Sequence, residues 1–95
     1  MNREATLRRR DGVTEARISE REVVLLGPEA EDYFGLDPVA ADVWSRLARP
    51  VTFGALVAAL ADDYDAEPAR IAADVAPMID ALVEGGLVER GSGDA

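Results

Sequence analysis

The sequence predicts a single α+β domain in which a small antiparallel sheet is followed by three helices. Short β-favouring runs separated by turn residues fill the first third of the chain, and apolar residues at helical spacing fill the rest. A length of 95 residues leaves room for one hydrophobic core. Three short helices with a small sheet are the elements of a winged helix-turn-helix domain. We expect this domain to span residues 13–90, between a flexible N-terminal arm at residues 1–12 and a disordered tail at residues 91–95.

Two or three short strands are expected before the helices. Their ranges are residues 13–18, 23–26 and 30–36, with a further stub at Leu87-Val88. The turn pair Gly27-Pro28 separates the second strand from the third. Because side chains alternate along a strand, Phe34 and Tyr33 should lie on opposite faces, and we expect Phe34 in the core and Tyr33 exposed. A sheet this small leaves an edge strand whose backbone can pair with another extended chain.

The three helices have recognisable start and stop residues. They are expected at residues 38 to about 48, at residues 53–64, and from a start within residues 65–68 to residue 84. Asp37 and Thr52 should cap the first two, because their side-chain oxygens can accept hydrogen bonds from exposed N–H groups. Gly85-Gly86 should end the third helix, which carries Pro77 in its interior, where proline removes a hydrogen bond and a kink is expected. The apolar stripe of the first helix is predicted to consist of Val39, Val43, Trp44 and Leu47.

The composition argues against several classes of function. Cysteine and histidine are both absent, so that disulfides, thiolate chemistry and the usual metal ligands are not expected, and no cofactor is predicted. A formal charge of −9 disfavours binding to nucleic acid. Four of the ten arginines lie in the first ten residues, but no apolar run follows them as in a signal peptide, and no stretch is long enough to span a membrane. We therefore expect a soluble, cytoplasmic protein that is not an enzyme.

Several spaced segments resemble PqqD-like proteins, which are recognition elements for ribosomally made, post-translationally modified peptides. The resembling segments are Tyr33-Phe34-Gly35-Leu36-Asp37, then Val43-Trp44 and Leu47, then Thr52, then Ile71-Ala72-Ala73-Asp74-Val75, and finally Leu82 and Gly85-Gly86-Leu87. The resemblance covers residues 18–90. A chain of this length with the Tyr-Phe-Gly-Leu-Asp run is most similar to the branch found in lasso-peptide biosynthesis. That branch works with a separate leader peptidase and a cyclase.

The resemblance implies a binding mode for a precursor leader peptide. In that family the leader adds as a strand to the edge of the third strand, beside a cleft against the third helix. Carried over to this chain, the strand contacts are Glu31, Asp32, Tyr33, Phe34 and Gly35, and the cleft residues are Ile71, Asp74, Val75 and Met78. Tyr33 would offer an aromatic surface, and Asp74 would accept a hydrogen bond. The expected partners are the leader and a separate leader peptidase or modifying enzyme, with no nucleic acid and no membrane.

Each of these assignments has an alternative. Met78 fits the core as well as a groove, and Asp74 could be an ordinary solvated helix residue. A winged-helix DNA-binding regulator would share the fold, but the second helix has no basic residue and the third has only Arg70. An acidic adaptor that binds another protein through the same sheet edge also stays open. A small enzyme is the least supported alternative, because no set of catalytic residues is placed together.

Overall fold

The computed structural model describes residues 2–28 and 33–91. In these ranges it contains six strands and three helices. In chain order they are β1 (Thr6–Arg9), β2 (Thr14–Arg17), β3 (Val23–Leu26), β4 (Phe34–Leu36), α1 (Pro38–Arg46), β5 (Val51–Thr52), α2 (Phe53–Tyr64), α3 (Pro68–Glu84) and β6 (Val88–Gly91). The predicted α+β class is confirmed, and the three helices follow small antiparallel strands in a winged-helix-like arrangement. No helix in the described ranges is long and apolar enough to cross a membrane.

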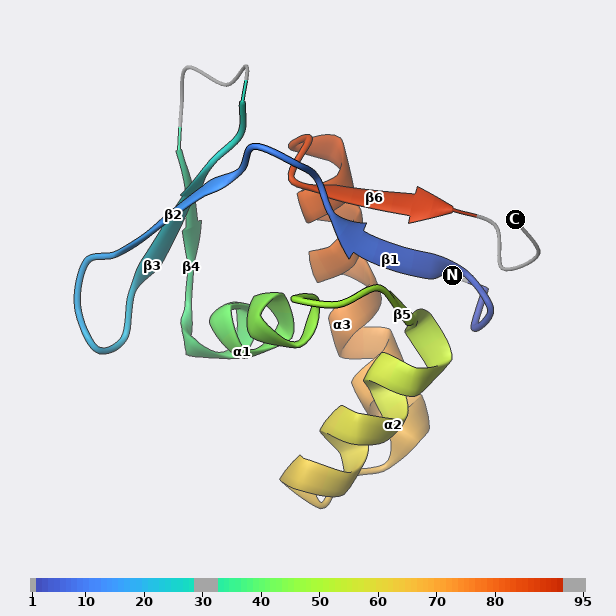
Figure 1. Ribbon diagram of the computed structural model, residues 1–95. Coiled ribbons are helices and arrows are strands. Elements are labelled where there is room, and N and C mark those ends of the chain that lie inside the picture. The colour runs from blue at the N-terminus through green and yellow to red at the C-terminus, as the bar shows by residue number, and fades with distance from the viewer. Residues whose placement is uncertain (1, 29–32, 92–95) are drawn as a thin grey trace.

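The strands form two small sheets, whereas the sequence predicted one. One sheet has the order β2-β3-β4 and the other β5-β1-β6, and all pairs are antiparallel. Figure 1 shows the two sheets on either side of the connection that leads from β1 to β2. The second sheet joins the two ends of the chain, because β1 pairs with β6 along four residues of each strand.

The predicted flexible arm is wrong for the residues of β1. Ala5 and Leu7 are buried, so this segment contributes apolar surface to the core. Its charged residues are held in place too, since Arg8 forms an ion pair of 3.3 Å with Glu89 on β6. The predicted stub near Val88 is a full strand that continues to Gly91, and residues 92–95 of the predicted tail lie outside the described residues. The sequence did not predict this strand, because it lies in a run of arginines and has only one strongly apolar residue.

The β2-β3-β4 sheet has one face on the core. Leu25 pairs with Phe34, and Val23 pairs with Leu36, and all four side chains are buried or half-buried. Because β4 is described from Phe34 onward, the predicted strand residues 30–32 lie outside the described part. The register places the side chain of Phe34 on the core face, and at Gly35, the next residue, the outer face carries no side chain.

The predicted caps are present at both helices. Asp37 accepts a hydrogen bond of 2.8 Å from the backbone N–H of Ala40, and Thr52 accepts one of 3.1 Å from that of Ala55. Gly86 has φ +76°, a left-handed conformation that glycine adopts without strain, and the chain leaves α3 there. The starts of α1 and α2 and the end of α3 are therefore encoded by local residue choices.

The apolar stripe of α1 differs from the prediction at one position. Val43, Trp44 and Leu47 are buried, but Val39 is 45% exposed and Ala40 is buried in its place. Ala40 precedes Val43 by three residues and Trp44 by four, which is the spacing of a continuous helical face. The larger side chain at position 39 lies on the flank of this face.

Pro77 is accommodated inside α3 without ending the helix. The helix runs from Pro68 to Glu84, and Pro77 and Ala73 are both exposed. The carbonyl of Ala73, which loses its helical donor, lies on the exposed side of the helix, where water can satisfy it. The predicted kink at this position stays a prediction.

Candidate peptide-binding site

The strand order leaves β4 at the edge of its sheet. Within the described residues β4 pairs with β3 on one side and with no strand on the other. Figure 1 shows β4 leading directly into α1, whose N-cap is Asp37. An edge strand presents backbone N–H and C=O groups that an extended peptide can pair with. This edge is the one that the resemblance indicated.

The residues along this edge leave room for an added strand. Tyr33 is 73% exposed, and Gly35 is exposed as well. A Cβ atom built on Gly35 would meet nothing within 4 Å, so the space over the strand is open on that face. On the opposite face the ring of Phe34 is half-buried and packs against the core. A peptide paired with β4 would therefore meet two different faces.

A row of residues on α3 leads toward β4 and comes close to it at Gly85. Asp74, Met78, Ala81 and Gly85 follow one another at spacings of four, three and four, which places them on one side of the helix. The row ends at Phe34, because a Cβ built on Gly85 would lie 3.5 Å from Phe34 Cδ2. Asp74 is exposed, whereas Met78 and Ala81 are half-buried. We call Tyr33, Phe34, Gly35, Asp74 and Met78 the β4–α3 face.

The structure separates the predicted helix residues into two groups. Asp74 and Met78 reach the surface, and Met78 also packs against the core. Ile71 and Val75 are only 8% and 3% exposed and belong to the core. They pack in the core on the buried side of α3 and do not line an open surface. The predicted strand residues Glu31 and Asp32 lie outside the described residues.

Sequence reasoning missed Gly85 as a neighbour of the strand. It continues the helical spacing that starts at Asp74, and this spacing is the signal that could have identified it. A Cβ atom at this position would lie 3.5 Å from Phe34 Cδ2, so glycine leaves room for the ring of Phe34 at the end of α3.

The chemistry of the β4–α3 face is that of a binding surface. Asp74 forms no hydrogen bond or ion pair within residues 2–28 and 33–91, so its carboxylate is available as an acceptor. Among these same residues there is no group of three side chains that could hold a metal ion. Backbone groups, an aromatic ring, a thioether and one carboxylate can bind a peptide by pairing and packing.

Comparison with known families identifies the chain. Residues 22–88 match the family described as coenzyme PQQ synthesis protein D (PqqD), and this range covers most of the sequence. The chain belongs to the PqqD family. The range begins just before β3 and ends at the start of β6, so it contains the β4–α3 face. A comparison with curated proteins found no match.

Two solved structures support the assignment to PqqD-like recognition elements. TbiB1, in complex with the TbiA(beta) leader peptide, is 32% identical to this chain with a TM-score of 0.75, over 86% of this chain and 94% of TbiB1. The second is the PqqD truncation of Methylobacterium extorquens PqqCD, a stand-alone recognition element for ribosomally synthesized and post-translationally modified peptides. It is 34% identical with a TM-score of 0.72, over 90% of this chain and 89% of that chain. The predicted resemblance to PqqD-like recognition elements is confirmed, and the similarity to the lasso-peptide branch stays a prediction.

Proposed function

We propose that this chain is a non-catalytic recognition domain that binds the leader of a ribosomally made precursor peptide by strand addition to β4. One observation carries the proposal. The outer edge of β4 is open beside an accessible row of α3, in a chain that is 32% identical to a protein described with its leader peptide. Main-chain pairing at such an edge binds many sequences, and side-chain contacts select among them.

The two faces of β4 determine which residues of this chain would contact the side chains of a bound leader. Side chains of the added strand alternate, so that every second residue lies on the core side, near Phe34 and Met78. The residues between them lie on the outer side, over Gly35 and beside Tyr33. The flexible thioether of Met78 can adapt to apolar side chains of different shapes. Asp74 would accept a hydrogen bond from the leader at the far end of the row.

The domain would work by delivering the precursor. A bound leader raises the local concentration of the attached core peptide at a separate leader peptidase or modifying enzyme. This role needs no chemistry by the domain itself and no cofactor. The similarity to the lasso-peptide branch makes a leader peptidase the first partner to test. All of these steps would take place in the cytoplasm.

The direct test is calorimetric titration with a synthetic leader from the precursor encoded beside this protein. A scrambled leader and a DNA duplex serve as controls. Saturable binding of the native leader alone supports the proposal. Binding of the duplex would instead support a winged-helix regulator, and binding of neither would contradict the proposed guest.

A further inference from the structure

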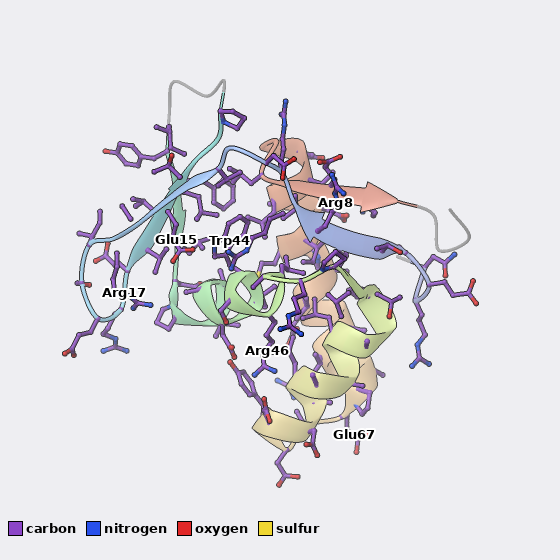
Figure 2. The ribbon with its side chains drawn as sticks, in the orientation of Figure 1. Arg8, Glu15, Arg17, Trp44, Arg46 and Glu67 are labelled. Atoms are coloured by element: carbon purple, nitrogen blue, oxygen red, sulfur yellow. The ribbon has the colours of Figure 1, made fainter. Side chains whose placement is uncertain are left out.

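A second concave site lies away from the β4–α3 face. It is a pocket of about 390 Å³ between β1, the connection that follows it, and the C-terminal end of α1. Its lining includes Arg8, Arg9, Arg10, Glu15, Trp44 and Pro50, and none of the residues of the β4–α3 face. We call it the arginine pocket. Figure 2 shows Trp44 of α1 between Glu15 of β2 and Arg8 of β1.

The guanidinium of Arg9 is held in a fixed position in this pocket. It lies over the ring of Trp44 at 4.2 Å from the centroid. Its Nε and Nη2 donate to the backbone carbonyl of Trp44 at 3.2 and 2.6 Å. Nη1 is 4.0 Å from a carboxylate oxygen of Glu15, which is beyond hydrogen-bond distance. A guanidinium has five N–H groups, so Arg9 keeps donors for a further acceptor in a preorganised geometry.

Arg10 adds a positive charge that is not neutralised locally. It is half-buried, and its Nη1 lies near Gly86. Within the described ranges no carboxylate lies within 4.0 Å of this guanidinium, whereas Arg8 is paired with Glu89. The carboxylates in the lining are those of Asp11 and Glu15. Glu15 accepts a hydrogen bond of 2.6 Å from Trp44 Nε1 and forms an ion pair with Arg9 at 4.0 Å, so its charge offsets that of Arg9 and not that of Arg10.

The remaining walls of the arginine pocket are apolar. Val13, Leu47, Ala48 and Pro50 surround the charged groups. Fixed donors beside apolar walls fit a carboxylate that is flanked by apolar side chains. The volume suits one or two side chains. A nucleic acid is disfavoured, because a chain of net charge −9 repels a polyanion around so small a basic site.

We propose that the arginine pocket is a second binding site, which takes an acidic segment with apolar neighbours from a partner protein. The lining carries three arginines and two carboxylates, and among the described residues Arg10 is the arginine of the lining that has no carboxylate within 4.0 Å. A carboxylate of the partner segment would pair with it. The inference goes beyond leader binding, and it stands on different residues. A domain with two such sites could hold a peptide and a second protein at the same time.

The only tryptophan of the chain lines the pocket, so its fluorescence can report occupancy. The probe is a hexapeptide of alternating leucine and glutamate, blocked at both ends, and its control is the same peptide with glutamine. We expect a saturable change with the glutamate peptide that weakens at 0.5 M salt, and none with the glutamine peptide. Arg10→Gln should weaken binding about tenfold. Arg21→Gln, at an exposed turn outside the pocket, should leave it unchanged.

Other outcomes would overturn the proposal. Equal binding of both hexapeptides would show that the carboxylates are not recognised, and equal effects of the two arginine variants would remove Arg10 from the site. The same fluorescence change with inorganic phosphate or a DNA duplex would mean a general anion site. Leader titration of Arg10→Gln separates this inference from the proposed function, because leader affinity should be retained and a thermal melt should show a folded protein.

Discussion

The indole N–H of Trp44 donates a hydrogen bond of 2.6 Å to the carboxylate of Glu15. This bond connects α1 to β2, a strand whose four residues are all exposed. The same ring carries the guanidinium of Arg9 at 4.2 Å. Trp44 therefore connects α1 with the β2-β3-β4 sheet and with β1 (Figure 2).

We predict that Trp44→Ala destabilises the domain by about 3–5 kcal/mol, because the side chain is 3% exposed and its removal leaves a cavity. Trp44→Phe keeps most of the apolar volume and should cost less. Urea unfolding followed by circular dichroism measures both. If Trp44→Ala unfolds at the same urea concentration as the unchanged protein, Trp44 does not support the core.

We predict that Tyr33→Ala weakens leader binding while the melting temperature stays within about 2 °C, since the exposed ring contributes little to the core. Calorimetry of the folded variant measures the affinity. Val39→Ala is the matched control, because Val39 is an exposed apolar residue of α1 outside the β4–α3 face. Equal leader affinity in the two variants would remove Tyr33 from the binding site.

We predict that Pro77→Ala stabilises the domain by about 1–3 kcal/mol. The substitution restores a helical hydrogen bond to the carbonyl of Ala73 in the middle of α3. Denaturant unfolding measures the gain, and leader titration of the same variant tests whether a kink shapes the β4–α3 face. A loss of stability would instead mean that proline helps here by restricting the unfolded chain.

We predict that Asp42 makes stability depend on acid pH. Burial raises the pKa of the Asp42 carboxyl, but hydrogen bonds from Tyr64 and Arg46 lower it by more, so that the folded pKa lies below the ordinary value. The stabilisation is therefore complete above the unfolded pKa, near 3.8, and is lost as the pH falls through the folded pKa. The unfolding free energies of the unchanged protein and of Asp42→Asn should differ at pH 7 and converge near pH 2.

A second variant tests the cause of this pH dependence. Tyr64→Phe removes one hydrogen-bond donor to Asp42 and leaves the carboxylate in place. The unfolding free energy of this variant should therefore fall less between pH 7 and pH 2 than that of the unchanged protein, but it should still fall. The same urea titrations at several pH values measure it. The unfolding free energies of the unchanged protein and of Asp42→Asn could also differ by the same amount from pH 7 to pH 2. That result would show that the pKa of Asp42 does not change on folding.

Sequence patterns predicted the helical part of the fold well, because the signals there are local. The caps at Asp37 and Thr52 and the stop at Gly85-Gly86 act within one turn of the helix, and the helices begin where these residues require. The strand β1 was not predicted. Its pairing partner β6 lies at the other end of the chain, and no local pattern reports so distant a pairing.

The candidate site was predicted in part for a similar reason. Alternation along β4 correctly separated the exposed Tyr33 from the half-buried Phe34. Spacing alone could not show whether Ile71 and Val75 line a cleft or lie in the core. In a helix with a broad apolar face, the sequence does not show which apolar residues the rest of the domain covers. The contact of Gly85 with Phe34 supplies this information.

The pairing of β1 with β6 also brings the start of β1 next to the end of β6. Thr6 faces Gly91 across the sheet, so a short linker between these two residues would not cross the body of the domain. The exposed turn at residues 19–21, closed by a hydrogen bond from Ile18 N to Glu22 O, offers a place to open the chain. A circular permutant built in this way would have its new ends where the turn now joins β2 to β3, and it would keep both sheets.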